Sequence, residues 1–400
     1  MSSSFRKRVV TSLAKLPAAT RVNPHSAQLL VSTGVPALDD VLGGGLPVGG
    51  ILLIEQDRQT GYSNTLLSYF ASQGIASGHQ LCFVNAEQEE MDLQSQLPGW
   101  TSAPSEAESK QAADKKDPDL KIAWRYQNLP RVDKETENTQ GTAGEMAFCE
   151  RFDLSTRIPR EALERAKIDL IDGDKIAEMS QGDRYRGDMY KCVLDEIARI
   201  IDAGGFSSLQ QPPAGHERNI LRLELRSLGS AFWRGDTSIL QFLHALRGLL
   251  RYSYVACVIS LPVHLYDGDS GRLPVVRRIE HLCDAVIELE SFEGAYAKPT
   301  DIVGGRKAGA ATEYHGFLHI HKLPRVNSLT AAGGRLSILH SGGGSANNLA
   351  FRQRRKKFCI ETYHLPIEGG VTERRVPEDN KKARAVGCGS RPGKPDPLEF

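Results

Sequence analysis

Short apolar runs alternate with segments of helical periodicity along much of the chain. After a glycine-rich turn, residues 51–54 indicate a buried strand, and a second apolar run covers residues 81–85. Between them, apolar residues recur on one face of a helix that is expected to begin at Ser63, whose hydroxyl can cap the first amides, and to end at about Gly74. This order of strand, helix and strand predicts an α/β fold with a mostly parallel central sheet.

The same alternation returns after a polar middle section. Two late segments alternate apolar and polar residues, which is typical of antiparallel or edge strands added to the sheet. The expected elements are helices at 189–201 and 239–250, buried strands at 219–225, 255–260 and 285–289, and alternating strands at 315–323 and 358–364.

Polar stretches divide the chain. We expect one domain at residues 28–368, with insertions at about 101–183 and 329–348, because charged residues, alanine, serine and glycine replace the periodic pattern there. The insertions are expected to be mainly loops. Residues 369–400 are expected to form a polar C-terminal tail.

The N-terminus is basic and contains no acidic residue before Asp39. Residues 1–27 are expected to be a disordered basic leader. A mitochondrial presequence stays open as the alternative, although Pro17 and Pro24 interrupt helix continuation.

Composition excludes several functional classes. With 40% hydrophobic and 25% charged residues, the chain can bury a globular core, and its net charge of +1 means that any nucleic-acid site must be local. The seven cysteines are scattered without a C-x-x-C pair, which favours a reducing compartment over a disulfide framework or zinc module. Charged residues interrupt every apolar stretch, so we expect a soluble chain that does not contact a membrane.

The connection after the first buried strand has the position and length of a phosphate-binding loop. The motif G-x-x-x-x-G-K-[ST] uses glycines to wrap backbone amides around phosphate, a lysine to neutralise charge and a hydroxyl to bind magnesium. Here the first glycine is Gln56 and the lysine is Tyr62. A simple strand-to-helix connection is the alternative to a degenerate nucleotide site. The full register is Gln56, Asp57, Arg58, Gln59, Thr60, Gly61, Tyr62 and Ser63.

The second half of a magnesium-ATP site also departs from the ATPase pattern. A strand ending in Asp or Glu should coordinate magnesium, yet the matching strand ends at Arg226. Glu224 lies two residues earlier on the same face, where a solvated or ion-paired side chain is the expected state. Phosphoryl transfer depends on charge stabilisation, so we assign no catalytic residue and no cofactor.

Several long motifs occur together along the chain, at residues 33–50, 121–127, 219–222, 228–230, 242–251, 315–320, 322–325 and 398–400. With the loop that lacks a lysine, these stretches resemble one family, that of the fourth subunit of the eukaryotic Elongator complex. The resemblance covers residues 27–400 apart from the polar insertions.

This resemblance implies a RecA-like fold with a degenerate P-loop. It implies a non-catalytic subunit that forms a heterohexameric ring with subunits 5 and 6, two copies of each, docked on core subunits 1, 2 and 3. The ring is expected to bind tRNA and to support 5-carboxymethyluridine formation at the wobble uridine, in the cytoplasm and nucleus. The alternatives are a RecA-family ATPase with an atypical or interface-completed site, and a recombination-type filament protein, which the insertions and the absent lysine oppose.

Two groups of side chains suggest RNA contact. The densest cationic run precedes the last expected strand, and its residues are possible contacts for tRNA phosphates, a nuclear import signal or a solvated loop. Trp124, Arg125, Tyr126 and Arg131 mix rings with cations, but their alternation favours a partly buried strand. The cationic run consists of Arg352, Arg354, Arg355, Lys356 and Lys357.

A group of histidines raises the question of a metal site. His319 and His321 would point to the same side of a strand, near His315 and His364. No cysteine pair or evident third carboxylate ligand accompanies them in the sequence, so we expect no metal.

Overall fold

The computed structural model describes most of the chain before Tyr363, and those residues belong to one compact unit. The expected C-terminal tail, His364 and the segment around Trp124 lie outside the described residues. The described ranges are 16–23, 26–87, 92–100, 147–210, 218–268, 271–272, 274–293, 314–326 and 349–363.

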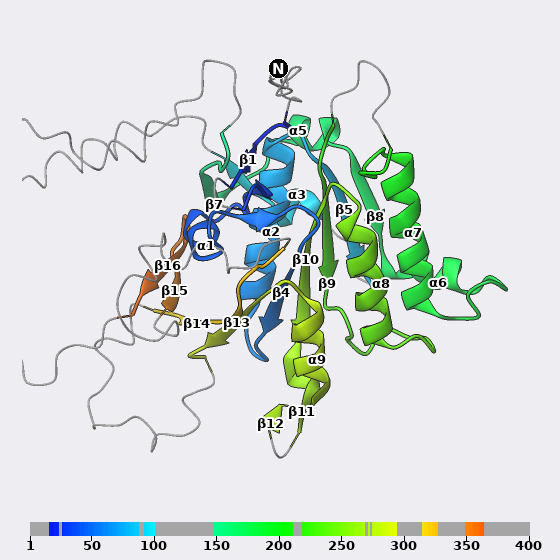
Figure 1. Cartoon of the computed structure of the whole chain (residues 1–400). Coiled ribbons are helices and arrows are strands. Elements are labelled where there is room, and N and C mark those ends of the chain that lie inside the picture. Colours follow the sequence, from blue (N-terminus) through cyan, green and yellow to red (C-terminus); the bar gives the residue numbers. More distant parts are fainter. Residues whose placement is uncertain are drawn as a thin grey trace, which may run out of the picture. The chain divides into compact units, whose positions relative to one another are not determined.

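A twisted sheet forms the centre of the described structure (Figure 1), with the strand order β16-β15-β14-β13-β4-β10-β9-β5-β8. Six neighbouring strands, from β13 to β8, are parallel. Their apolar runs are buried on both faces, as a parallel sheet covered by helices requires. The parallel strands are β4 (Ile51–Gln56), β5 (Gln80–Asn85), β8 (Ile168–Ile171), β9 (Leu221–Arg226), β10 (Val255–Pro262) and β13 (Ala285–Ser291).

The strand order identifies the fold. The first strand, β4, lies between β10 and β13, which come later in the chain, and the loop 56–63 leaves its carboxyl end. When β8 is set aside and the other five parallel strands are numbered 1 to 5 in chain order, from β4 to β13, their order across the sheet is 5-1-4-3-2. This is the order of a RecA-like core. The expected α/β, RecA-like fold with a mostly parallel sheet is confirmed.

Antiparallel strands extend one edge of this sheet. The two expected alternating segments form β14 and β16, and β15, which we did not expect, lies between them. The antiparallel strands of the central sheet are β14 (Gly316–Lys322), β15 (Leu349–Gln353) and β16 (Phe358–Thr362). Further short strands pair outside the central sheet: β1 (Thr20–Val22), β2 (Leu29–Val31), β3 (Leu46–Pro47), β6 (Pro98–Trp100), β7 (Phe152–Arg157), β11 (Asp267–Gly268) and β12 (Gly271–Arg272).

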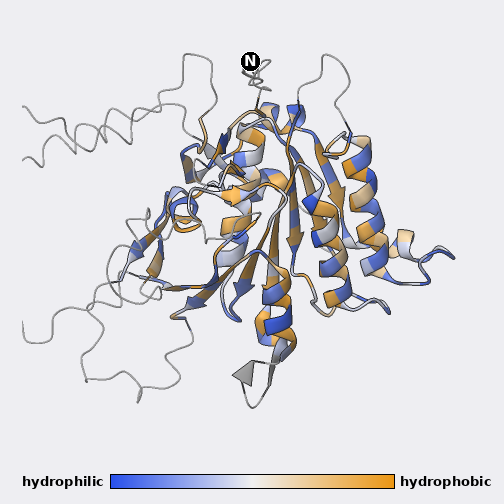
Figure 2. Cartoon of the chain, viewed as in Figure 1, coloured by the Kyte–Doolittle hydropathy of each residue, from blue (hydrophilic) through white to orange (hydrophobic). Residues whose placement is uncertain are grey.

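Helices cover both faces of the sheet, and the two largest of three apolar clusters lie on its opposite sides. Leu53 and Leu223 pack on the side of α7 and α8, whereas Leu52 and Ile54 pack on the side of α2. Figure 2 shows apolar strands between helices whose surfaces are mixed. None of the described helices is long and apolar enough to cross a membrane. The helices are α1 (Pro36–Val41), α2 (Tyr62–Ala76), α3 (Leu93–Gln96), α5 (Arg160–Arg165), α6 (Gly173–Ser180), α7 (Met189–Ala203), α8 (Ile239–Arg251), α9 (Pro274–Leu282) and the 3-10 helix η3 (Val263–Tyr266).

The helix after the loop differs from the expected one at both ends. It begins at Tyr62 with Gly61 as its N-cap, so Ser63 is a buried residue of the first turn and caps nothing. It continues past Gly74 to Ala76 because this glycine serves packing instead of termination: an added Cβ would lie 2.7 Å from Cδ of Arg222.

Parts of two segments expected to be irregular carry regular structure. Within 101–183, the described residues form β7, α5, β8 and α6, and β8 pairs with β5 at the sheet edge. Within 1–27, β1 pairs with β2. These elements have three to eight residues, too few for a periodic pattern to stand out from polar surroundings.

Candidate functional site at the carboxyl edge of the sheet

The loop that replaces a phosphate-binding loop is closed by its own carboxylate. Asp57 Oδ1 accepts hydrogen bonds from the backbone amides of Gln59 at 3.2 Å and Thr60 at 2.8 Å, and from the Thr60 hydroxyl at 2.8 Å. Two amides of the motif therefore already have an anionic partner. Gly61 has a φ of −100°, so this position does not require glycine either. The loop has the length of a phosphate loop without its open ring of amides.

Tyr62, in the position of the essential lysine, is a packing residue. Its ring makes edge contacts with Phe351, at 4.9 Å between centroids, and with His315, at 5.8 Å. These partners lie on β15 and just before β14, so the ring ties the start of α2 to the antiparallel extension. Partial burial raises the pKa of the Tyr62 hydroxyl, with Glu293 and Asp57 adding to the effect. The side chain therefore stays neutral where an ATPase needs a cation.

The strand end that should carry a magnesium ligand holds a buried ion pair. Arg226 Nε donates to Glu224 Oε1 at 2.5 Å, and Arg226 Nη1 donates to Gln96 Oε1 at 2.7 Å. The Glu224 side chain is fully buried, which raises its pKa, while the Arg226 charge opposes the shift. Of the two states expected for Glu224, solvated or ion-paired, the structure shows the ion-paired one. Glu224 is poorly suited to bind magnesium, because the guanidinium of Arg226 already neutralises its charge.

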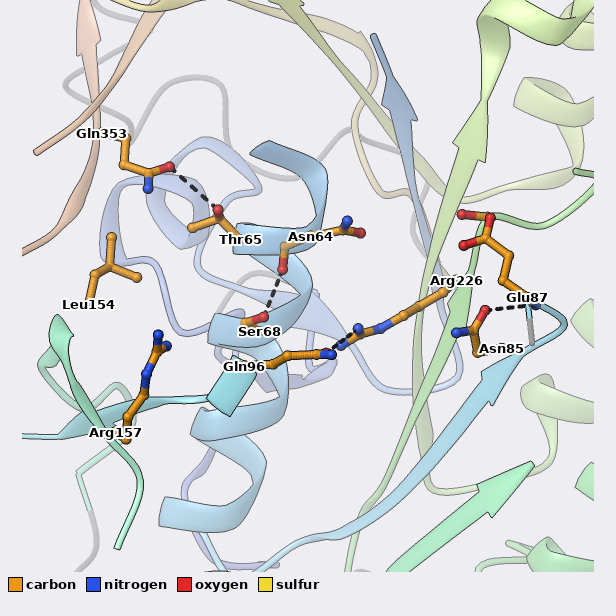
Figure 3. A pocket seen from close by; sticks show the side chains of 11 residues that line it. Asn64, Thr65, Ser68, Asn85, Glu87, Gln96, Leu154, Arg157, Arg226 and Gln353 are labelled. Carbon is orange, nitrogen blue, oxygen red and sulfur yellow. Dashed lines mark hydrogen bonds between the residues drawn. The ribbon is translucent and has the colours of Figure 1, made fainter. Parts of the chain in front are cut away.

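A polar cavity of about 430 Å³ opens beside this ion pair (Figure 3). Its walls come from α2, from the ends of β5 and β9, and from β7, α3 and β15. Asn64, Asn85 and Gln353 are among the lining residues. Sequence reasoning missed them because they come from distant parts of the chain and share no motif. In open α/β sheets, ligands bind in the crevice outside the carboxyl ends of the strands, and this cavity lies there.

Tyr62→Lys in the isolated subunit is expected to leave ATP hydrolysis at background. Lysine restores one charge, but Asp57 still occupies the loop amides and Arg226 still stands at the strand end. Phosphate release measures the activity, and a thermal unfolding scan shows whether the variant keeps its fold without the ring contact to Phe351. Sustained turnover by this single variant would contradict the assignment of the loop as inactive.

The cationic run forms a hairpin between β15 and β16. Arg352 lies on β15 and pairs with Glu361 at 2.7 Å, so it is less available for RNA than expected. The turn itself is held by the Arg354 amide, which donates to the Lys357 carbonyl at 2.8 Å. The four side chains from Arg354 to Lys357 are exposed. They form a local basic surface.

The histidines of β14 face carboxylates, contrary to the sequence-based expectation. His319 Nε2 lies 2.6 Å from Glu290, and His321 Nε2 lies 2.7 Å from Glu288 and 3.8 Å from the buried Glu55. The expectation of no nearby carboxylate is wrong because pairing of β4, β13 and β14 aligns distant residues. Glu55, Glu288 and His321 could hold a cation, since their ligand atoms lie within 4.8 Å of one another. An ion pair explains them equally well, and the absence of a metal stays a prediction.

The strand order and the altered loop define a RecA-like α/β protein whose phosphate loop is closed by its own aspartate. A family model described as PAXNEB protein matches residues 13–399. Elongator complex protein 4 of Xenopus laevis is 33% identical, covering 100% of this chain and 95% of that protein. Elongator complex protein 4 of Homo sapiens is 33% identical, covering 96% and 88%. The chain therefore belongs to the PAXNEB family, the family of Elongator complex protein 4.

Among solved structures, the flagellar accessory protein FlaH of Methanocaldococcus jannaschii is similar. It is 12% identical, and the match covers 86% of this chain and 99% of that one with a TM-score of 0.39. This value is too low to add to the fold assignment, which rests on the strand order.

Proposed function

We propose that this chain is a non-catalytic RecA-like subunit of the Elongator complex. In this proposal it forms a heterohexameric ring with subunits 5 and 6, contacts core subunits 1, 2 and 3, and supports 5-carboxymethyluridine formation in tRNA, in the cytoplasm and nucleus. The observation that carries the proposal is a full-length match to Elongator complex protein 4 in a chain whose phosphate loop is occupied by Asp57. A scaffold needs the fold but not phosphoryl transfer.

Ring formation is tested by mixing the chain with its two partner subunits. Mass measurement in solution should give a six-membered assembly with two copies of each subunit. A chain that stays monomeric under all conditions would contradict the proposal. The same ring separates the scaffold from an ATPase with an interface-completed site: if altering residues 56–63 leaves hydrolysis by the ring unchanged, the loop has no catalytic role.

The exposed hairpin is the proposed tRNA contact. Changing Arg355 and Lys356 to Gln is expected to weaken tRNA binding by the ring roughly tenfold or more, because each phosphate that is no longer neutralised keeps its counterions. When the logarithm of the association constant for tRNA is plotted against the logarithm of the salt concentration, the line should become less steep by about 0.7–0.9 for each such phosphate. Titration of labelled tRNA at several salt concentrations measures both quantities.

A matched control changes Arg160 and Arg165, two exposed arginines of α5, to Gln. This variant removes the same formal charge from a different surface. Equal weakening by both variants would mean that net charge, and not the hairpin, determines affinity.

A further inference from the structure

The antiparallel extension of the sheet, formed by β14, β15 and β16, differs between its two faces. On one face, Leu318, Phe351 and Ile360 belong to the apolar cluster on the side of α2. On the other face, the apolar cluster formed with α7, α8 and α9 includes no described residue of these three strands. Figure 1 shows the extension leading away from α7 and α8. Among the described residues, this second face, the open face, therefore has no apolar layer of helices.

Aromatic rings gather on the open face, where an uncovered sheet usually carries polar residues. Side chains alternate along a strand, so Phe317 points away from the buried Leu318. The Phe317 ring makes edge contacts with Phe292, at 4.8 Å between centroids, and with Tyr363, at 5.2 Å. Tyr314 continues the cluster, 5.7 Å from Tyr363. All four rings are partly exposed, so their mutual contacts orient them without removing them from solvent.

Charged side chains of the open face have partners on that face. Glu361 pairs with Arg352 at 2.7 Å, and the Arg352 guanidinium also lies 5.7 Å from the centre of the Tyr314 ring. Glu290 lies 2.6 Å from His319 Nε2. These contacts reduce the repulsion that the two carboxylates would exert on an approaching polyanion.

The exposed basic turn of residues 354–357 lies at one end of this face, because it joins β15 to β16. Phe317 is aligned with Ala350 of β15, and Arg354 follows four residues later along the chain. At the rise of a strand this separation is roughly 13 Å. A few nucleotides of a single strand can span it.

We propose that the open face stacks unpaired bases of an RNA strand whose phosphates contact the basic turn. Aromatic rings on an open sheet face stack bases in RNA-binding domains, and cations beside them hold the backbone. Phe317 and Tyr363 are the rings assigned to stacking. The inference rests on the proposed tRNA contact of the hairpin and adds to it the part of the RNA that is recognised, which is bases outside double helices.

Fluorescence titration of the complex with subunits 5 and 6 tests the stacking. The probe is a single-stranded oligoribonucleotide of about ten nucleotides with one 2-aminopurine base, whose emission falls when the base stacks. Phe317→Leu keeps an apolar side chain but removes the ring, and is expected to weaken binding roughly tenfold and to abolish the fall in emission. Phe317→Tyr keeps a ring and should bind normally, which separates stacking from loss of fold.

Salt dependence and matched variants sharpen this test. Phe317→Leu should leave the salt dependence of binding unchanged, because stacking releases no counterions, whereas the Gln variants of Arg355 and Lys356 reduce it. Tyr363→Leu should also weaken binding. Tyr252→Leu is its control, since Tyr252 is 61% exposed on another surface, and should bind normally. A duplex of the same sequence should bind Phe317→Leu and the unaltered protein equally, because its bases are already stacked and paired.

Three results would overturn the inference. The first is single-strand binding that is unchanged in both Phe317→Leu and Tyr363→Leu, and the second is an equal loss for single strand and duplex. The third is normal RNA binding by variants that no longer assemble with subunits 5 and 6, which would make the open face a protein interface.

The inference and the proposed function fail separately. If the complex does not form, the same titrations with the isolated full-length chain decide, and absence of RNA binding there as well would contradict stacking. An effect of Phe317→Leu without any effect of the Arg355 and Lys356 variants would support stacking and contradict the tRNA contact of the hairpin.

Discussion

Replacing Arg222 with methionine is expected to lower the free energy of unfolding by about 3–5 kcal/mol. Arg222 is fully buried in β9, and its guanidinium joins three segments. Its Nη1 donates to the carbonyls of Ser32 at 2.8 Å and Phe70 at 3.1 Å, and its Nε donates to His79 Nδ1 at 3.1 Å. Methionine fills part of the volume but leaves all three acceptors without this donor.

The charge states around Arg222 increase the expected cost. Burial lowers the pKa of Arg222 to about 9, with attraction to Asp39 opposing the shift, so the side chain is still a cation at neutral pH. Burial and the Arg222 charge together lower the pKa of His79 to about 3. Neutral His79 can therefore accept from Arg222. Without Arg222, the fully buried Asp39 has less positive potential around it.

Urea unfolding of the full chain, followed by circular dichroism, measures this effect. Arg277→Met, at an exposed position of α9, is the control and is expected to change stability by less than about 0.5 kcal/mol. A decrease of under about 1 kcal/mol in Arg222→Met would mean that water or a rearranged Asp39 replaces the guanidinium.

Long buried elements were predictable from the sequence because their residues have one environment. The run 255–260 is apolar except for Ser260 and became β10, all of whose residues are buried. The helix α7 also agreed with the prediction, both in its apolar face and in its end at Gly204. The strands β8 and β15 were missed for the opposite reason. β8 is a half-buried edge strand of four residues, and the last two residues of β15 are the polar Arg352 and Gln353.

The absence of the ATPase groups was also visible in the sequence, but the contacts of the residues that replace them were not. Tyr62 and Arg226 stand in motif positions, so their departures from an ATPase could be recognised. Their partners Phe351 and Gln96 are brought to them by sheet pairing and loop packing, which no local pattern encodes. Asp57 is a partial exception. An aspartate that binds amides two and three residues ahead is a common turn, and its position gave a signal that could have been used.

Gly34→Ala is expected to destabilise the chain by about 2–5 kcal/mol. Gly34 has a φ of +87°, which costs a residue with a Cβ about 1–2 kcal/mol. An added Cβ would also lie 2.5 Å from the Tyr69 carbonyl oxygen, which belongs to the backbone of α2 and cannot rotate away. The helix or the 32–35 turn must therefore shift, and that turn is held by Asp39 through the Thr33 amide.

The chain contains a matched control for this substitution. Gly78 follows the end of α2 with a φ of +69°, and an added Cβ there meets nothing within 4 Å. Gly78→Ala should therefore show the backbone cost alone, about 1–2 kcal/mol. The difference between the two variants in urea unfolding isolates the contact between the turn and α2. Equal effects would show that this contact is looser than the geometry indicates, and that the glycine before α1 is required for its φ alone.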